Sequence, residues 1–161
     1  MNNNSNDPSP ADIIICERGI VSDSIFMETM RYQSKITDME YLTYKSLWEI
    51  VVKTVSECIP SLFVYLCPTI DESMKRVKNR NRNGEQGLPR EYQSILQGKH
   101  DQLFNKEYVT MGDNKIPVLK IETDSNFRDD IDVKIELANT VEDKILKMKE
   151  LDKNKIKCGL Y

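Results

Sequence analysis

Short apolar runs alternate with longer amphipathic stretches along this chain. The runs are rich in β-branched and aromatic residues and bounded by proline or charged residues, as expected of buried strands: 12–16 (DIIIC), 61–67 (SLFVYLC) and 116–122 (IPVLKIE). The charged sequence ERG follows the first run directly, so we expect that strand to open onto a site at its carboxyl end. Strands that alternate with helices favour an α/β fold with a parallel sheet.

The amphipathic stretches predict five helices, at about 23–32, 38–57, 69–81, 89–103 and 129–151. Ser22 and Asp23 are expected to cap the first helix. Thr37 precedes the second, in which apolar residues recur every three or four positions from Tyr44 onward. We interpret this stripe, which includes Trp48, as packing against a core rather than as a cofactor site.

The composition fits one soluble domain. The chain has 161 residues, of which 39% are hydrophobic and 30% charged. We expect a domain at 12–151 between a disordered polar tail, 1–11, and a second tail, 152–161. The first tail lacks the cationic start and apolar segment of a signal peptide, and no apolar run approaches the roughly 18 residues of a membrane span. The expected location is cytoplasmic, and a mitochondrial one stays open if the natural N-terminus lies further upstream.

Cysteine spacing and net charge narrow the possible partners. The four cysteines are widely spaced without a CxxC pair, and His100 is the single histidine, so neither a zinc site nor a disulfide framework is indicated. We expect four reduced thiols and assign His100 no role. The net charge of −3 argues against nucleic acid or an anionic membrane as a partner, so an anion site has to be a local cluster.

One such cluster lies in and around residues 78–92 (KNRNRNGEQGLPREY). Arg76 and Arg80 are four residues apart and share one face of the predicted helix, and Arg82 follows where that helix should end. Guanidinium groups in this arrangement can hold phosphate oxygens, and the two glycines that follow would let the segment close over a ligand. The pattern is that of a nucleotide lid, and a solvated basic helix end is the alternative.

The order of residues in this segment resembles the lid of the deoxyribonucleoside kinases, the deoxycytidine and deoxyguanosine kinase family. The family pattern is R-x-x-x-R-x-R-x-x-E-Q-G-I/L-P-x-E-Y, matched here by Arg76, Arg80, Arg82, Glu85, Gln86, Gly87, Leu88, Pro89, Glu91 and Tyr92. Upstream, CERGIVSDSIF (16–26) resembles the family's E-R-S-x-x-S-D-x-x-F, from which Gly19 departs. ETDSNFRDD (122–130) resembles its adenine-binding loop, and the similarity covers roughly 12–150.

The resemblance implies phosphorylation of a deoxyribonucleoside to its 5′-monophosphate with ATP and Mg²⁺, a step of nucleotide salvage. The implied substrates are deoxyguanosine, deoxyadenosine or deoxycytidine. Arg18 would be catalytic beside the 5′ oxygen, and Glu17 would help hold the magnesium shell indirectly. Asp23 would contact the base, as in the deoxycytidine and deoxyguanosine branches, and Glu85 would accept a hydrogen bond from the sugar 3′-hydroxyl.

For the ATP side, the resemblance implies that Arg76 and Arg82 hold the donor phosphates and that Arg80 with Phe127 stacks on the adenine. The residues alone leave simpler interpretations open. Without the family, Glu17 and Arg18 are a surface pair at a strand end, Asp23 is a helix cap, and Phe127 is a core aromatic residue.

The chain departs from the family in one large respect: it contains no G-x-x-x-x-G-K-S/T sequence. Its only Gly-Lys pair, Gly98-Lys99, is followed by His100. The family's general-base glutamate and the residues that clasp the nucleobase also have no counterpart. We therefore expect a P-loop kinase-like parallel sheet, with flanking helices, that lacks its P-loop strand. The strand at 12–16 would then need a new partner.

Two hypotheses of different class follow. The first is a deoxynucleoside kinase whose sequence is incomplete here, through an incomplete gene prediction, an expressed part or a split gene. The second is a natural non-catalytic remnant that binds a full-length kinase or a nucleotide. The resemblance also implies a homodimer formed through the helices at 23–32 and 38–57.

Overall fold

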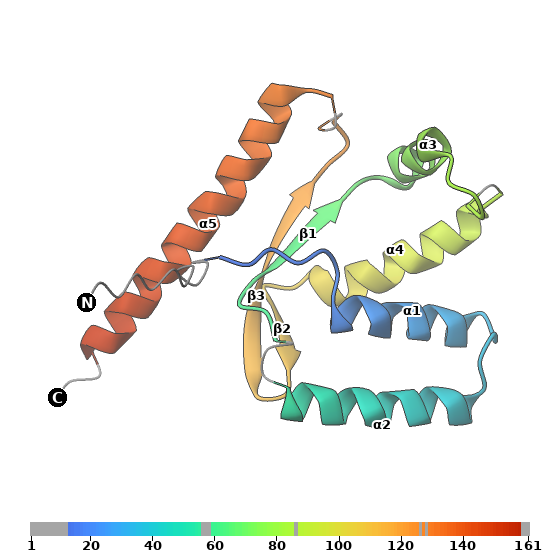
Figure 1. The fold of residues 1–161 in the computed structure, drawn as a ribbon, viewed down its shortest axis with the longest axis horizontal. Helices are drawn as coiled ribbons and strands as arrows, with labels where there is room; N and C mark the ends of the chain where they lie inside the picture. Colours follow the sequence, from blue (N-terminus) through green and yellow to red (C-terminus); the bar gives the residue numbers. More distant parts are fainter. Residues whose placement is uncertain (1–12, 56–58, 86, 126, 128, 159–161) are drawn as a thin grey trace, which may run out of the picture.

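The computed structural model describes residues 13–158 except 56–58, 86, 126 and 128, and side chains as far as Glu150 (Figure 1). The chain combines helices with a sheet that contains a parallel strand pair, which confirms the α/β class. In chain order they are α1 (Ile20–Tyr32), α2 (Asp38–Thr54), β1 (Phe63–Cys67), α3 (Ile70–Arg80), α4 (Arg90–Phe104), β2 (Tyr108–Met111), β3 (Asn114–Glu122) and α5 (Ile131–Cys158).

The sheet has the order β1-β3-β2. β1 pairs in parallel with β3, with Phe63 opposite Val118 and Cys67 opposite Glu122. β2 pairs antiparallel with β3 through a tight hairpin at Gly112, whose φ of 56° lies in the left-handed region that favours glycine. The hairpin strand β2 was not among the predicted strands. Because β2 is antiparallel to β3, the expected parallel pairing occurs in the described sheet only between β1 and β3.

The predicted strand at 12–16 is wrong for the part that the structure describes, 13–16. This segment is not assigned to a strand, and the side chains of Ile14 and Ile15 are 80% and 87% exposed. A strand needs a neighbour to pair its backbone groups, and the described sheet provides none beside this segment. The apolar pattern alone was therefore not a sufficient signal for a strand, because it did not specify a partner.

The core lies between the sheet and the helices α1, α2 and α4, while α5 lies on the other side of the sheet in Figure 1. The buried apolar residues come from five elements: Val21, Ile25, Val52, Phe104, Val109, Met111 and Ile116. Trp48 packs against this cluster, and its indole Nε1 donates to the carbonyl of Ile20 at 3.1 Å. Trp48 of this stripe therefore packs as predicted, whereas Leu47 of the same stripe is 58% exposed.

The helix boundaries differ from prediction at three places. α1 begins at Ile20 with Gly19 as its N-cap, so Asp23 lies within the first turn and does not cap the helix. α2 ends at Thr54, before the predicted end, and 56–58 lie outside the described residues. α5 continues through Cys158, so 152–158 of the predicted tail are helical backbone, and 159–161, like the predicted tail at 1–11, lie outside the described residues. Within the described part of the chain, no helix combines the length and apolar character needed to cross a membrane.

Candidate functional site

The carboxyl ends of β1 and β3 lie at one edge of the sheet, because the two strands are parallel. Ligands of open α/β sheets bind outside the carboxyl ends of their strands. Here β1 leads through Pro68 into α3, and β3 leads into a loop described at Thr123, Asp124, Ser125 and Phe127, which we call the β3 loop. The backbone N–H of Thr123 donates to the carbonyl of Cys67 at 3.2 Å and joins the two segments.

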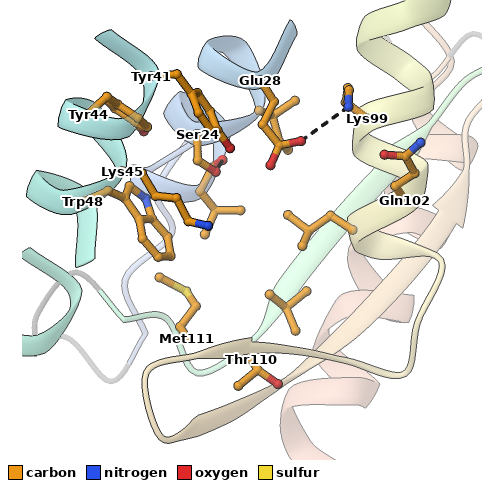
Figure 2. Close-up of a pocket in the computed structure, with 14 residues that line it drawn as sticks. Ser24, Glu28, Tyr41, Tyr44, Lys45, Trp48, Lys99, Gln102, Thr110 and Met111 are labelled. Carbon is orange, nitrogen blue, oxygen red and sulfur yellow. Dashed lines mark hydrogen bonds and ion pairs between the residues drawn. The ribbon is translucent and has the colours of Figure 1, made fainter. Parts of the chain in front are cut away.

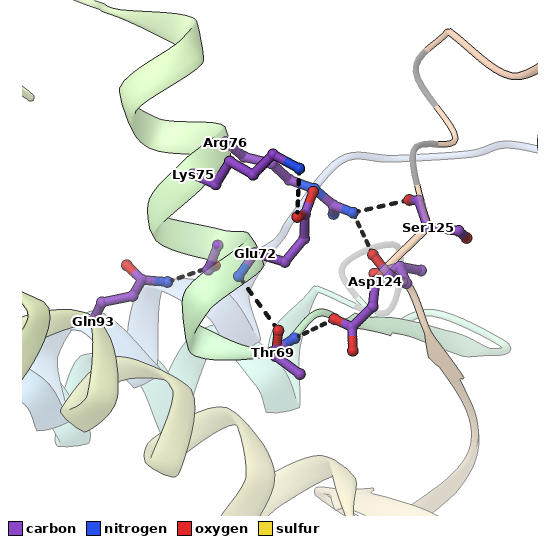
Figure 3. Close-up of polar contacts among 9 residues, drawn as sticks. Thr69, Glu72, Lys75, Arg76, Gln93, Asp124 and Ser125 are labelled. Carbon is purple, nitrogen blue, oxygen red and sulfur yellow. Dashed lines mark hydrogen bonds and ion pairs between the residues drawn. The ribbon is translucent and has the colours of Figure 1, made fainter.

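The first turn of α3 is joined to the β3 loop by a carboxylate (Figure 3). Thr69 is the N-cap, and its hydroxyl accepts a hydrogen bond from the backbone N–H of Glu72 at 3.3 Å. The backbone N–H of Thr69 donates to Oδ1 of Asp124 at 2.6 Å. The start of the predicted lid helix is thereby fixed to the loop that resembles the family's adenine-binding segment.

Arg76 makes a second connection between α3 and the β3 loop, as Figure 3 shows. Its Nε donates to Oε1 of Glu72 at 3.0 Å, and its Nη2 donates to the carbonyls of Thr123 and Ser125, the latter at 3.2 Å. Its guanidinium carbon lies 4.7 Å from the ring centroid of Phe127. The sequence-based assignment paired Arg80 with Phe127, whereas the structure places Arg76 on this ring.

Arg80 instead binds Glu85 across the turn that follows α3. Its Nε and Nη2 donate to the two carboxylate oxygens at 2.9 and 2.7 Å, the paired geometry that guanidinium and carboxylate groups favour. Gly84 and Gly87, with φ of 88° and 87°, make the turn possible. Glu85, predicted to bind the sugar, and Arg80, predicted to bind the donor, are thus brought together. Opposite charges on either side of a glycine are the sequence signal that could have indicated this pair. Arg82, between them in sequence, is exposed.

Glu17 and Arg18 are both exposed at the start of α1. Arg18 has a φ of 62°, and its guanidinium carbon lies 5.1 Å from the ring centroid of Phe26.

Burial holds the pKa of His100 below its usual value. The hydrogen bond with the carbonyl of Leu96 opposes this shift, and the charge of Arg18 adds to it. The neutral imidazole stacks on Tyr65, with ring centroids 6.0 Å apart, consistent with a packed histidine.

Asp23 has a partner that the sequence did not reveal. The hydroxyl of Tyr44, on α2, donates to Oδ2 of Asp23 at 2.8 Å. Burial, together with the carboxylate of Asp23, raises the pKa of Tyr44, so its phenol stays protonated and remains a donor at physiological pH. Tyr44 belongs to the stripe that was interpreted as packing, and nothing in that periodicity points to a carboxylate on another helix.

Tyr44 also lines a cavity of about 310 Å³ bounded by α1, α2, α4 and β2 (Figure 2). Aromatic and aliphatic side chains, Trp48 among them, form much of its wall. Lys99 pairs with Glu28 across it, with Nζ and Oε2 3.6 Å apart. The side chain that holds Asp23 is therefore also a wall residue of this cavity.

Few side chains in the described structure are placed together as possible ligands of a metal ion. Across the described residues, no three or more histidine, cysteine or carboxylate side chains are grouped to hold an ion. Mg²⁺ commonly takes one or two protein carboxylates together with substrate phosphates and water. Glu17, a single exposed carboxylate, fits the indirect role that the sequence predicts, in which the phosphates supply most ligands.

The predicted site residues thus fall into three groups. Glu17 and Arg18 lie before α1, Asp23 lies on α1 against α2, and the four charged lid residues with Phe127 lie around α3 and the β3 loop. Their predicted contacts with substrates remain predictions.

Comparison with known proteins identifies the family. Residues 2–147 match the family described as deoxynucleoside kinase. The chain is 26% identical to deoxycytidine kinase of Bos taurus over 129 residues, which are 77% of this chain and 50% of that protein. It is 31% identical to a probable deoxycytidine kinase of fowlpox virus over 120 residues, 73% of this chain and 49% of that protein. It is 27% identical to deoxyadenosine kinase of Dictyostelium discoideum over 106 residues, 65% of this chain and 40% of that protein.

A solved structure shares the fold. The deoxyadenosine kinase from M. mycoides with bound dCTP superposes with a TM-score of 0.56 at 18% identity, over 74% of this chain and 60% of that one. The predicted kinase-like α/β fold is thereby confirmed. The chain spans about half the length of the curated relatives that it matches. With the family matched over most of its residues, the chain belongs to the deoxynucleoside kinase family.

Proposed function

We propose that this chain serves in the phosphorylation of a deoxyribonucleoside to its 5′-monophosphate, with ATP as donor, in cytoplasmic nucleotide salvage. The substrate is deoxyguanosine, deoxyadenosine or deoxycytidine. The observation that carries the proposal is the junction of the lid segment, residues 76–89, with the β3 loop at the carboxyl edge of the parallel strands. The contact of Arg76 with the loop whose sequence resembles an adenine site supports a donor site at this edge.

On the donor side, phosphoryl transfer depends on positioning and on neutralising charge. Bound Mg²⁺ would neutralise charge on the donor phosphates, with Glu17 acting on its shell. Arg80 and Arg82 are the lid arginines available to approach the donor. For Glu85 to accept the 3′-hydroxyl of the sugar, its pairing with Arg80 has to open, so closure of the lid would exchange an internal ion pair for two ligand contacts.

On the acceptor side, Arg18 would lie beside the 5′ oxygen and Asp23 would accept a hydrogen bond from the base. The hydroxyl of Tyr44 occupies one carboxylate oxygen of Asp23 and leaves the other for a base amino or ring N–H group. The phenol of Tyr44 is protonated and can only donate to the carboxylate. Asp23 therefore acts as the acceptor in this contact, and its second oxygen can accept from the base. This arrangement suits deoxycytidine and the purine deoxynucleosides.

The isolated chain is expected to transfer no phosphate to deoxyguanosine, deoxyadenosine or deoxycytidine. Its sequence has no P-loop and no matching general base, so neither the phosphates nor the 5′-hydroxyl proton has its usual partner. The measurement is formation of radiolabelled monophosphate from ATP with each nucleoside. Turnover above a control without enzyme, abolished by Arg18→Ala, would contradict this expectation.

An exposed apolar face on α2 favours association with a kinase chain as well. Four large side chains on this helix are 56–73% exposed: Met39, Leu42, Leu47 and Ile50. Several large apolar side chains exposed on one helix are typical of an interaction site. The face supports the homodimer proposed through 23–32 and 38–57, and equally the second hypothesis, a non-catalytic chain that binds a full-length kinase or a nucleotide.

Leu47→Lys is expected to weaken self-association by about tenfold or more, because a charged ammonium would be buried in an apolar interface. Sedimentation equilibrium over a range of concentrations measures the dimer constant. Leu146→Lys on α5 is the matched control, since Leu146 is 51% exposed and Leu47 58%. A wild-type chain that stays monomeric throughout, or equal weakening by both substitutions, would refute the α2 interface.

A further inference from the structure

The guanidinium of Arg76 is committed to protein groups on several sides. Nε donates to Glu72, Nη2 donates to two carbonyls of the β3 loop, and the face of the group lies on the ring of Phe127. The side chain is 30% exposed. Arg76 therefore differs from Arg82, which is exposed just after the end of α3.

These contacts limit what Arg76 can offer to a phosphate. A guanidinium holds a phosphate through two parallel N–H groups along one edge. One usable edge pairs Nη2 with Nε, and the other pairs Nη2 with Nη1, so both require Nη2. Nη2 carries two hydrogens and donates to two carbonyls, those of Thr123 and Ser125. While these bonds hold, only Nη1 remains for a ligand.

The contact with Phe127 also restricts where an aromatic base can stack. Two stacking contacts at about 3.5 Å each require roughly 7 Å between the groups on either side of a base. The guanidinium carbon of Arg76 lies 4.7 Å from the ring centroid of Phe127. A base therefore has no room between them and would stack on the opposite face of the ring.

What Arg76 does hold is the backbone of the β3 loop. The carbonyl of Thr123 belongs to a residue that is 3% exposed, and a buried carbonyl that loses its partner is strongly disfavoured. Together with the bond from Thr69 to Asp124, the Arg76 contacts attach the loop to α3 at the helix start and again about two turns along. Loop and lid helix are thereby joined as one unit.

We propose that Arg76 is a positioning residue that fixes the β3 loop to α3, and that it leaves the bidentate phosphate contact to the arginines further along the lid. The sequence pattern predicts a phosphate contact for Arg76; this inference assigns its main effect to the loop instead. The part that concerns the donor rests on the proposed function, whereas the attachment of the loop is independent of it.

Amide hydrogen exchange of the chain without nucleotide tests the attachment. In Arg76→Lys, which keeps the charge but loses the fork of N–H groups, exchange at Thr69 and Thr123 should quicken about tenfold or more. Lys75→Ala is the matched control, because Lys75 also pairs with Glu72 but has no contact with the loop. It should leave both rates near those of the wild type. Unchanged exchange in a folded Arg76→Lys chain would overturn the proposal.

Glu72→Gln separates the two roles by opposite outcomes and serves equally if Arg76→Lys does not fold. If Arg76 is a positioning residue, losing the carboxylate should quicken exchange at Thr123 and should not tighten binding of trinitrophenyl-ATP, measured by fluorescence. If Arg76 is chiefly a phosphate ligand, removing its competitor should tighten binding and leave exchange unchanged, which would overturn the proposal. Should no variant and no wild-type chain bind this nucleotide, the proposed function fails for the chain alone, and exchange still decides the role of Arg76.

Discussion

Arg82→Ala is expected to lower turnover by about a thousandfold or more in a chimera that joins this chain to the P-loop half of a related deoxycytidine kinase. Arg82 is exposed after the end of α3, between Arg80 and Glu85 in sequence, where lid closure would bring it to the transferring phosphoryl group. An arginine that neutralises charge at this point of the reaction has an effect of this size. Steady-state kinetics with saturating ATP would measure the loss in kcat.

The control for Arg82 is Lys75→Ala in the same chimera. Lys75 is a cation on α3, its side chain is 67% exposed, and it pairs with Glu72 rather than with a lid group. A general loss of positive charge would affect both variants alike, whereas a specific contact with the transferring group affects only Arg82. Equal and small losses at the two positions would show that Arg82 does not act on the donor phosphates.

Asp23→Ala is expected to shift kcat/KM by orders of magnitude away from deoxyguanosine and deoxycytidine and toward thymidine. The carboxylate would accept a hydrogen bond from an amino or ring N–H group that thymine does not present in the same place. Losing one polar match in a closed site changes discrimination to this extent. Kinetics of the chimera on the four natural deoxynucleosides would measure the ratio.

Tyr44→Phe gives a second, graded measurement of the same contact. It removes the hydroxyl that donates to Asp23 but keeps the ring that lines the cavity between α1 and α2. The shift should have the same direction as in Asp23→Ala and a smaller size, because the carboxylate remains but is less well held. If Asp23→Ala leaves the ratio among the four nucleosides unchanged, Asp23 has no part in reading the base.

The secondary structure followed from the sequence wherever the signal was local. The break after Arg80 and the start of α4 after Pro89 lie where residue types and spacing predicted them. β2 was missed because Tyr108–Met111 is a short strand, and only its hairpin with β3 gives it a partner. The strand predicted at 12–16 failed for the converse reason, since an apolar run becomes a strand only beside another one.

The candidate site divides in the same way. The sequence by itself determined which charged residues lie on α3 and in the turn after it, and it also contained the pairs that are close along the chain, Glu72 with Arg76 and Arg80 with Glu85. These contacts depend on local geometry, that of a helix and that of a glycine turn. This geometry is similar from one protein to another, so the spacing of the residues is enough to predict the contacts.

Only the tertiary structure decided which partner each remaining group has. Arg76 binds backbone carbonyls 47 and 49 residues away, and Tyr44 reaches Asp23 across 21 residues. Every residue carries a carbonyl, so side-chain types cannot single out Thr123 or Ser125 as acceptors. Such contacts arise only when the packing of α3 against the β3 loop, and of α1 against α2, brings distant segments within hydrogen-bonding distance. For this reason the sequence predicted a lid with its arginines, and the fold determined that one of them holds the loop beside it.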